Sequence, residues 1–236
     1  MNGSVLASNL ELKRIPYSFF KRIIDFTLSL FLIIVLSPVM LIIAVAIKID
    51  SNGPAIFRQA RTGKNGKVFM VWKFRSMTAS NDIKDKSCED RYTTVGKFIR
   101  RTSLDELPQL FNILFGEMSF IGPRPWITDY YDNMNEIQKH RCDVLPGITG
   151  LAQAKGRNNI SIFEKINYDL EYIDNYSLKE DIKIIFLTFK VVLAKAGVSA
   201  GKATIYKEID DLKTQELSVK EIKMAEVDSV HSSAGF

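Results

Sequence analysis

Two carboxylates stand side by side in the stretch TSLDELPQL, at Asp105 and Glu106, shortly after the arginine pair Arg100 and Arg101. Adjacent negative charges repel each other, so the pairing indicates a positive group nearby, either a metal ion or basic side chains. Such carboxylates can act as nucleophiles and as oxygen ligands for Mg²⁺. Acidic side chains also favour the positive end of a helix, so a plain helix cap explains the same pair. The stretch by itself leaves both explanations open.

Basic residues that could bind phosphate groups are spread along the same part of the chain: Lys73, Arg75, Arg100, Arg101 and Arg124. No glycine-rich phosphate loop accompanies them, so phosphate binding would depend on these side chains and a metal ion. Taken singly, each is better explained as a solvated surface charge. The only two histidines, His140 and His231, lack partners at ligand spacing. A Ser–His–Asp triad and a histidine-rich metal site are therefore not expected.

The composition fits one globular domain with an appendage, since 46% of the 236 residues are apolar and 25% are charged. The net charge is +5, but Lys48 to Arg75 alone contains seven basic residues and one acidic residue. Such a stretch indicates an anionic partner, and lipid headgroups, nucleotide phosphates and nucleic acid all carry the right charge. Because the sequence shows no nucleic-acid motif, we expect no nucleic-acid partner.

An apolar segment of 22 uncharged residues, Phe26 to Ile47, precedes the carboxylates. As one helix it would be about 33 Å long, enough to cross a bilayer core of about 30 Å. However, Ser37-Pro38 lies at its midpoint, where proline removes a helical hydrogen bond that the serine hydroxyl can replace. Both flanks are also basic, and basic flanks prefer the cytoplasmic side. These features favour a re-entrant helix over a membrane-spanning one, without excluding a kinked span.

Further along, two strands near 55–61 and 67–74 are expected around the turn Lys64-Asn65-Gly66. Helices are expected over TTVGKFIRR, over 105–115 with an end at Gly116, over 127–140 and over SIFEKINYDLEYIDN. A last helix should begin with a capping box at Ser177 and Glu180 and stop at Gly197. The stretch LPGITGLAQAKGR should be loop-like with short extended pieces. The expected fold class is α+β and mostly helical, with a re-entrant membrane helix, a small β-hairpin and a helical cytosolic domain. The expected division is an N-terminal extension (1–18), the membrane helix (19–50), the cytosolic domain that contains the two carboxylates (51–200) and a polar tail (201–236).

Four stretches carry a resemblance to a known family: FKRIIDFTLSLFLIIVLSP, FRQARTGKNGKVFMVWKFRSM, TSLDELPQLFNILFGEMSFIGPRP and PGITGLAQAKGRN. They resemble, in order, the successive motifs of the bacterial sugar transferases, also called monotopic phosphoglycosyl transferases. The resemblance covers about residues 19–200 and is specific, because several motifs occur in the family's order. In length the chain resembles the short members of the family, which lack the large N-terminal domains of the long ones.

This resemblance implies an enzyme of the bacterial inner membrane whose catalytic domain lies in the cytoplasm. It would transfer a sugar 1-phosphate from a UDP-sugar to undecaprenyl phosphate and release UMP, an initiating step of surface glycan assembly. It also implies that Asp105 is the nucleophile and that Ser37-Pro38 is the break of a re-entrant helix. With this chemistry, we expect Asp105 or Glu106 to bind Mg²⁺. The expected substrate-binding residues are Lys73, Arg75, Arg100, Arg124, Gln153 and Arg157.

Membrane lipids are further expected partners, and a homodimer is left open. Two other functions stay in competition with the transferase. One is a kinked single-pass anchor with a soluble binding module whose basic hairpin binds lipid headgroups or nucleic acid. The other is a membrane-anchored nucleotide-sugar hydrolase that uses the same two carboxylates with water as the acceptor. The sequence does not specify which sugar is transferred.

Overall fold

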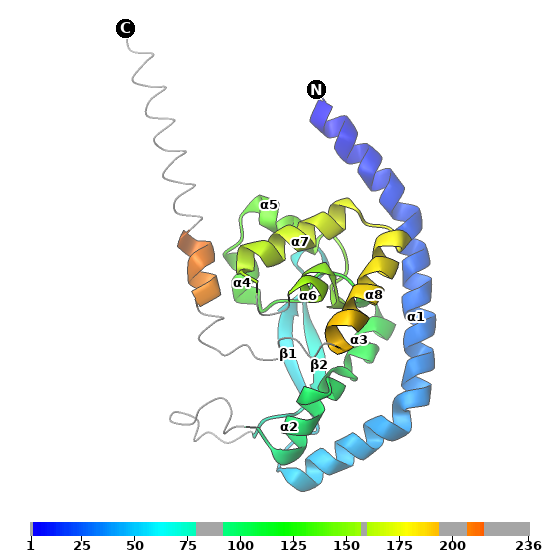
Figure 1. Cartoon of the computed structure of the whole chain (residues 1–236), viewed down its shortest axis with the longest axis vertical. Coiled ribbons are helices and arrows are strands. Elements are labelled where there is room, and N and C mark those ends of the chain that lie inside the picture. The colour runs from blue at the N-terminus through cyan, green and yellow to red at the C-terminus, as the bar shows by residue number, and fades with distance from the viewer. Residues whose placement is uncertain (1, 79–91, 157–159, 194–206, 215–236) are drawn as a thin grey trace.

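One long helix, α1 (Asn2–Asp50), runs along one side of the molecule and turns beneath it in its second half (Figure 1). The computed structural model describes residues 2–78, 92–156, 160–193 and 207–214. Ser37 Oγ donates a hydrogen bond of 2.8 Å to the carbonyl of Ile34, which Pro38 cannot reach because it has no N–H. The predicted compensation by the serine is therefore confirmed. The helix α1 continues through Ser37-Pro38, so the structure has a bend where the sequence predicted a break between two helices (Figure 1).

The apolar part of α1 packs against the rest of the protein with both of its halves. Leu32, Ile33 and Leu36 contact a core cluster formed by Val71, Leu110, Ile113 and Met118. Past Pro38, Ile43 and Ile47 are buried with Phe74 and Ile99. The opposite face of α1 leaves many large apolar side chains exposed, and the stretch Tyr17–Asp50 is long and apolar enough to cross a membrane. A membrane anchor is therefore plausible.

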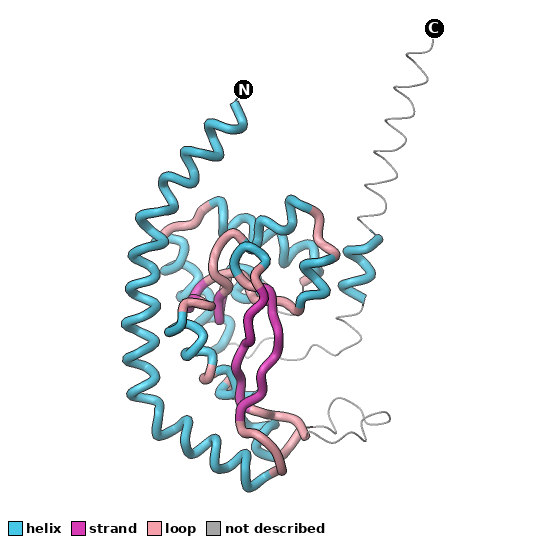
Figure 2. The backbone as a smooth tube through the Cα atoms, turned by 180° about the vertical axis from the view of Figure 1, so that it is seen from behind, coloured by secondary structure: helices cyan, strands magenta, loops and turns pink. Residues whose placement is uncertain are grey.

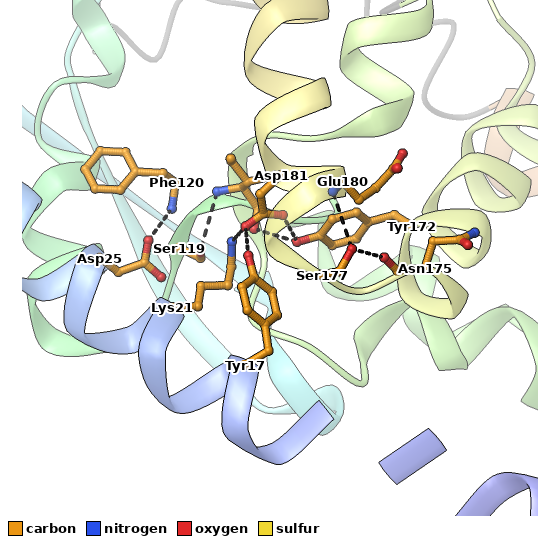
Figure 3. A network of polar contacts seen from close by, with 11 residues as sticks. Tyr17, Lys21, Asp25, Ser119, Phe120, Tyr172, Asn175, Ser177, Glu180 and Asp181 are labelled. Carbon is orange, nitrogen blue, oxygen red and sulfur yellow. Dashed lines mark hydrogen bonds and ion pairs between the residues drawn. The ribbon is translucent and has the colours of Figure 1, made fainter. Parts of the chain in front are cut away.

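The first flank of the apolar segment is tied to the domain by a buried polar network centred on Asp181 (Figure 3). Lys21 forms an ion pair with Asp181, and Tyr17 and Tyr172 donate hydrogen bonds of 2.5 and 2.8 Å to the same carboxylate. One turn further along α1, Asp25 accepts a hydrogen bond from the Phe120 amide at 3.2 Å. These contacts join α1 to three other elements: β3 (Ser119–Ile121), α7 (Ile162–Asp174) and α8 (Leu178–Leu193).

The second flank of the segment is tied to the same domain. The Asp50 carboxylate accepts a hydrogen bond of 2.8 Å from the Val95 amide, in the first turn of α2 (Thr94–Arg101). Arg75 binds carbonyls at and just past the end of α1, with distances of 3.5 Å to Ile47, 2.7 Å to Ser51 and 2.9 Å to Asn52. Cationic side chains are favourable there, because the last carbonyls of a helix lack intrahelical donors.

The predicted hairpin is confirmed and stands at the centre of the molecule (Figure 2). Its strands β1 (Ile56–Thr62) and β2 (Val68–Phe74) pair antiparallel around the turn η1 (Lys64–Gly66), with Phe57 opposite Lys73. Both Asn65 and Gly66 have positive φ, which explains the Asn-Gly pair in this turn. A second, parallel pair joins β3 to β4 (Gly147–Thr149).

Other sequence-based expectations were met in part. The predicted helix 127–140 is two short helices, α4 (Thr128–Asp132) and α5 (Glu136–Lys139), because Asn135 and Gln138 form a capping box that starts a new helix. In the segment expected to be loop-like with short extended pieces, the strand β4 is such a piece, whereas the helix α6 (Leu151–Lys155) was not predicted. The 3-10 turn η4 (His140–Cys142) directly follows α5 and precedes β4.

The two C-terminal helices of the domain agree with the sequence. α7 follows Ser161, where the predicted helical stretch begins, and Ser161 is its N-cap. At the start of α8, the Glu180 amide donates a hydrogen bond to Ser177 Oγ. The predicted stop of α8 at Gly197 lies outside the described residues. Within the segment expected to be a polar tail, residues 207–214 are helical, and Ile209 and Leu212 are buried against Tyr130, Ile162 and neighbouring side chains. The predicted domain boundaries stay predictions.

Candidate active site

Asp105 and Glu106 lie in a 3-10 turn, η3 (Leu104–Glu106), and not at the start of a helix. The expected helix 105–115 is shorter: α3 runs from Gln109 to Phe115 and ends at Gly116 with φ of 84°, as predicted. The carboxylates therefore do not cap α3, and neither η3 nor α3 has a side-chain cap hydrogen bond. Ser103, just before the turn, is held in the left-handed region at φ 58°. Such strain in a non-glycine residue is common at functional sites.

Glu106 is locked in place by two cations. Its Oε1 atom lies 2.5 Å from Lys73 Nζ and 3.0 Å from an Arg124 nitrogen. The side chains of Glu106 and Lys73 are mostly buried, whereas that of Arg124 is 44% exposed. Burial alone would raise the pKa of Glu106, but Arg124 and Lys73 outweigh that effect and hold the pKa below its usual value. Glu106 is therefore held in its charged form between the two cations.

Asp105, its neighbour, is held quite differently. The residue is buried, at 8% exposure, yet within the described part of the chain its carboxylate has no hydrogen-bond partner. Burial raises the pKa of Asp105; the Lys73 charge opposes the shift, and the adjacent Glu106 charge adds to it. A desolvated, unpaired carboxylate has oxygen lone pairs available to an incoming group. Of the two adjacent carboxylates, called the dyad below, Glu106 is held by two cations and Asp105 is without a hydrogen-bond partner among the described residues.

Arg124 reaches Glu106 from the loop 122–126, which contains the stretch GPRP and is called the GPRP loop below. The loop is fastened by backbone hydrogen bonds of 2.9 Å: Gly122 N to Thr149 O, Gly147 N to Pro123 O, and Thr62 N to Trp126 O. Gly147 permits this close approach, because a Cβ there would lie 2.1 Å from the Gly122 nitrogen. These backbone contacts hold Arg124 against Glu106, although the two residues are 18 positions apart in the sequence.

The other predicted substrate-binding residues are distributed unequally. Arg100 lies close enough for its charge to favour the ionised form of Asp105, and its guanidinium stacks 5.0 Å from the Tyr92 ring. Arg75 instead caps α1, as described above. Gln153 is on α6, and both polar atoms of its carboxamide are buried without a hydrogen-bond partner among the described residues. Arg157 lies outside the described residues.

Two features of the site were missed by sequence reasoning. Arg61 at the end of β1 interacts with both Arg124 and Glu106; burial lowers its pKa to about 10, and repulsion by Arg124 contributes. Arg141 and Asp169 form a buried ion pair of 2.7 Å, and Arg141 also donates to the Arg124 carbonyl at 2.9 Å. Arg61 stood in the basic stretch as one charge among several. No spacing rule links Arg141 with Asp169.

Asp105 and Glu106 also lie next to the apolar segment of α1. Leu104 and Leu107, on either side of it, pack against the cluster that contains Ile43 and Ile47 of α1. A reacting group at Asp105 is therefore close to the apolar half of α1 that follows Pro38.

A metal ion finds few protein ligands here. Within the described residues, no group of three or more His, Cys, Asp or Glu side chains could hold a metal. Both cations bind Oε1 of Glu106, so its Oε2 atom and the unpaired Asp105 carboxylate are the available oxygen donors among the described residues. Mg²⁺ is commonly held by one or two carboxylates together with substrate phosphates and water. The donor set fits a Mg²⁺ ion that arrives with phosphate groups, and not a fully protein-bound one.

Comparison with known proteins places these residues in a wider context. Residues 16–195 match the family described as Bacterial sugar transferase. The chain is 49% identical over 191 residues to a UDP-glucose:undecaprenyl-phosphate glucose-1-phosphate transferase of Klebsiella pneumoniae, a match that covers 75% of this chain and 41% of the relative. It is 39% identical over 199 residues to the undecaprenyl-phosphate galactose phosphotransferase of Salmonella typhimurium, covering 76% and 41%.

A shorter relative matches along most of its length. The sugar transferase EpsL of Bacillus subtilis is 42% identical over 180 residues, which is 75% of this chain and 89% of the relative. By contrast, the chain spans less than half the length of the glucose and galactose transferases named above. The family match covers well over half of the chain and includes the hairpin, the carboxylate dyad and the GPRP loop. The chain therefore belongs to the bacterial sugar transferase family.

Proposed function

We propose that this chain transfers a sugar 1-phosphate from a UDP-sugar to undecaprenyl phosphate in two displacements on phosphorus. In the first, an Asp105 oxygen bonds to the phosphorus that carries the sugar, and the phosphoanhydride bond breaks to release UMP. In the second, a phosphate oxygen of the lipid bonds to that phosphorus, and the bond to Asp105 breaks. The products are UMP and a lipid diphosphate sugar, and the aspartate is regenerated.

The observation that carries this proposal is the contrast within the dyad. A nucleophile needs a free lone pair, and Asp105 is the carboxylate without a hydrogen-bond partner in the described chain. Glu106 is committed to Lys73 and Arg124, so it serves to hold these cations beside Asp105. A covalent intermediate also means that the two anionic substrates never have to occupy the site together.

The cations around the dyad would balance charge on the phosphoryl oxygens. Lys73, Arg124 and Arg61 gather around Glu106, and Arg100 acts on Asp105. Positioning and electrostatic stabilisation dominate phosphoryl transfer, so preorganised cations are the main contribution a protein can make. Mg²⁺ bound by Asp105 and the substrate phosphates would supply further charge neutralisation. We expect a chelator to abolish activity and added Mg²⁺ to restore it.

The contacts of α1 support a re-entrant topology. Lys21 on one flank of the apolar segment pairs with Asp181, and Asp50 on the other flank binds the start of α2. Both flanks thus contact one domain, which a straight span across the bilayer would not allow while that domain stays on one side. The segment would enter and leave the same leaflet, with the dyad at the cytosolic surface of the bacterial inner membrane, where a lipid phosphate is located.

The names of the relatives support transfer to a lipid phosphate over hydrolysis, since both long relatives are named as undecaprenyl-phosphate sugar phosphotransferases. They differ in the sugar, so glucose and galactose are the first candidates. The test is to incubate the membrane-bound protein with radiolabelled UDP-glucose or UDP-galactose, with and without undecaprenyl phosphate. Label should enter the lipid fraction only when the acceptor is present. Continuous UMP release without acceptor would instead identify a hydrolase.

A further inference from the structure

Arg141 and Asp169 form the most deeply buried of the ion pairs among the described residues, with 2% of each side chain exposed. The Arg141 guanidinium donates twice to Asp169 Oδ2, at 3.0 Å from Nε and 2.7 Å from a terminal nitrogen. Its plane also lies against the Trp126 ring, with the guanidinium carbon 3.7 Å from the ring centroid. The guanidinium is therefore fixed by a carboxylate on one side and an aromatic face on the other.

From this position Arg141 reaches the backbone of the active-site loop. The terminal nitrogen that binds Asp169 also donates to the carbonyl of Arg124 at 2.9 Å. Arg124 stands between Pro123 and Pro125, whose rings restrict φ and the neighbouring backbone. Because the backbone at Arg124 is stiff, fixing its carbonyl also fixes the direction in which its side chain leaves. That side chain ends on Glu106, beside Asp105.

The contacts form one continuous line from α7 to the dyad: Asp169, Arg141, the Arg124 carbonyl, the Arg124 guanidinium and Glu106. A buried ion pair is a poor device for stability alone, because desolvation offsets much of the attraction between the charges. It is well suited to fixing one orientation, since a planar guanidinium can satisfy several acceptors only in one geometry.

We propose that Arg141, oriented by Asp169 and Trp126, is a positioning residue that aims the Arg124 guanidinium at the phosphoryl group. This inference rests on the proposed function, in which Arg124 neutralises phosphoryl charge. Arg141 acts only through Arg124 and touches neither substrate nor Asp105. Its contribution to activity should therefore disappear when the Arg124 side chain is removed.

The test is a double-mutant cycle with Arg141→Lys and Arg124→Ala, with activity expressed as kcat/KM per folded enzyme. Lysine keeps a positive charge beside Asp169, but a point donor cannot bind Asp169 and the Arg124 carbonyl while lying flat on Trp126. We expect Arg141→Lys to lower kcat/KM by about tenfold or more when Arg124 is present. With Arg124→Ala as the background, the same change should cost less than twofold.

Asp181→Asn provides the matched control, because Asp181 forms the other deeply buried ion pair, with Lys21, on α1 (Figure 3). Asp181→Asn should change kcat/KM by the same factor with and without the Arg124 side chain. If Arg141→Lys behaves like this control, with equal factors in both backgrounds, the pair is merely structural and the proposal is wrong. An effect of less than twofold with Arg124 present would also overturn it.

Two further measurements keep the test decisive. The affinity of the same proteins for UMP, measured by calorimetry, gives a second double-mutant cycle that needs no turnover. Arg141→Lys should weaken UMP binding when Arg124 is present and should have little effect when Arg124 is replaced by alanine. If Arg141→Lys does not fold, Trp126→Phe replaces it, because a smaller ring holds the guanidinium plane less firmly. Failure of the proposed function is distinct, since the wild-type chain would then transfer no sugar phosphate from any UDP-sugar. Equal factors in an active enzyme refute only the role of Arg141.

Discussion

Lys73 and Glu106 are joined by an ion pair of 2.5 Å, although 33 residues separate them in the chain. The pair connects the end of the hairpin to the turn that carries the dyad, and Arg124 completes it from the GPRP loop. Three segments of the sequence are thus held together by one carboxylate. The free Asp105 next to it owes its electrostatic surroundings to that arrangement.

Glu106→Gln should disrupt this arrangement while leaving the fold intact. A neutral amide no longer balances Lys73 and Arg124, and burial then lowers the pKa of Lys73 further. We expect activity to fall by about 100-fold or more. The pKa of Glu106 is below its unfolded value, so its stabilising effect is present above about pH 4.3 and is lost as pH falls through the folded pKa. At pH 7 the free energy of unfolding should therefore drop by about 1–3 kcal/mol, an effect limited by the exposure of Arg124.

Asp105→Asn should have the opposite effect on stability. The pKa of Asp105 is raised by burial, so the folded state binds a proton more tightly than the unfolded state does. Stability consequently falls as pH rises from the unfolded pKa, about 3.9, through the folded pKa, and the penalty remains at pH 7. Removing the charge should raise the melting temperature, by roughly 2–4 °C for each kcal/mol gained. Thermal unfolding of both variants at pH 7 checks this, and a destabilised Asp105→Asn protein would contradict it.

The pH dependence of activity should reflect the same carboxyl group. Only ionised Asp105 can attack phosphorus, so kcat/KM should fall as pH is lowered through its raised pKa, at a higher pH than for an ordinary aspartate. Glu106 should not contribute to this acidic limb, because its pKa is held low. A profile of kcat/KM between pH 4 and 8 measures the limb. A rate that is still maximal near pH 4 would refute this role of burial.

The topology of α1 can be tested with single cysteines in a background that lacks Cys88 and Cys142. Cysteines placed before residue 20 and after residue 50 should both be shielded from an impermeant thiol reagent added outside the cell. Pro38→Ala restores a helical N–H at the bend, and the resulting straight segment is long enough to cross the bilayer. We expect this variant to expose the N-terminal cysteine in part of the molecules. Labelling of that site in the unmodified sequence would establish a spanning helix.

Much of the architecture was predictable because local patterns determine it. The Asn65-Gly66 turn fixed the hairpin, Gly116 ended α3, and Ser161 began α7. The capping box of Asn135 and Gln138 was an equally local signal, and it would have revealed that two helices replace the predicted one. Local signals also explain why Lys73 binds Glu106 whereas Arg75 binds backbone carbonyls near the end of α1. β2 ends at Phe74, so the alternation that would put both side chains on one face stops between them.

The site itself was only partly predictable. Asp105, Glu106 and the nearby cations stand out in the sequence, and the structure brings Lys73 and Arg124 onto Glu106. The contrast between the two carboxylates depends on burial and on partners far away in the chain, which no local pattern records. The same is true of Arg141 and Asp169, 28 residues apart, whose relationship exists only once α7 packs beside the GPRP loop.

The central claim is that Asp105 carries the phosphosugar, and mass spectrometry of the trapped enzyme tests it most directly. The protein is incubated with a UDP-sugar in the absence of lipid acceptor, quenched and digested. We expect release of at most about one UMP per active enzyme, and a sugar-phosphate adduct on Asp105 in the peptide that contains TSLDELPQL. Asp105→Asn should show neither, whereas Glu106→Gln should keep some adduct. An adduct mapped to Glu106, or an active Asp105→Asn enzyme, would mean that Asp105 is not the nucleophile.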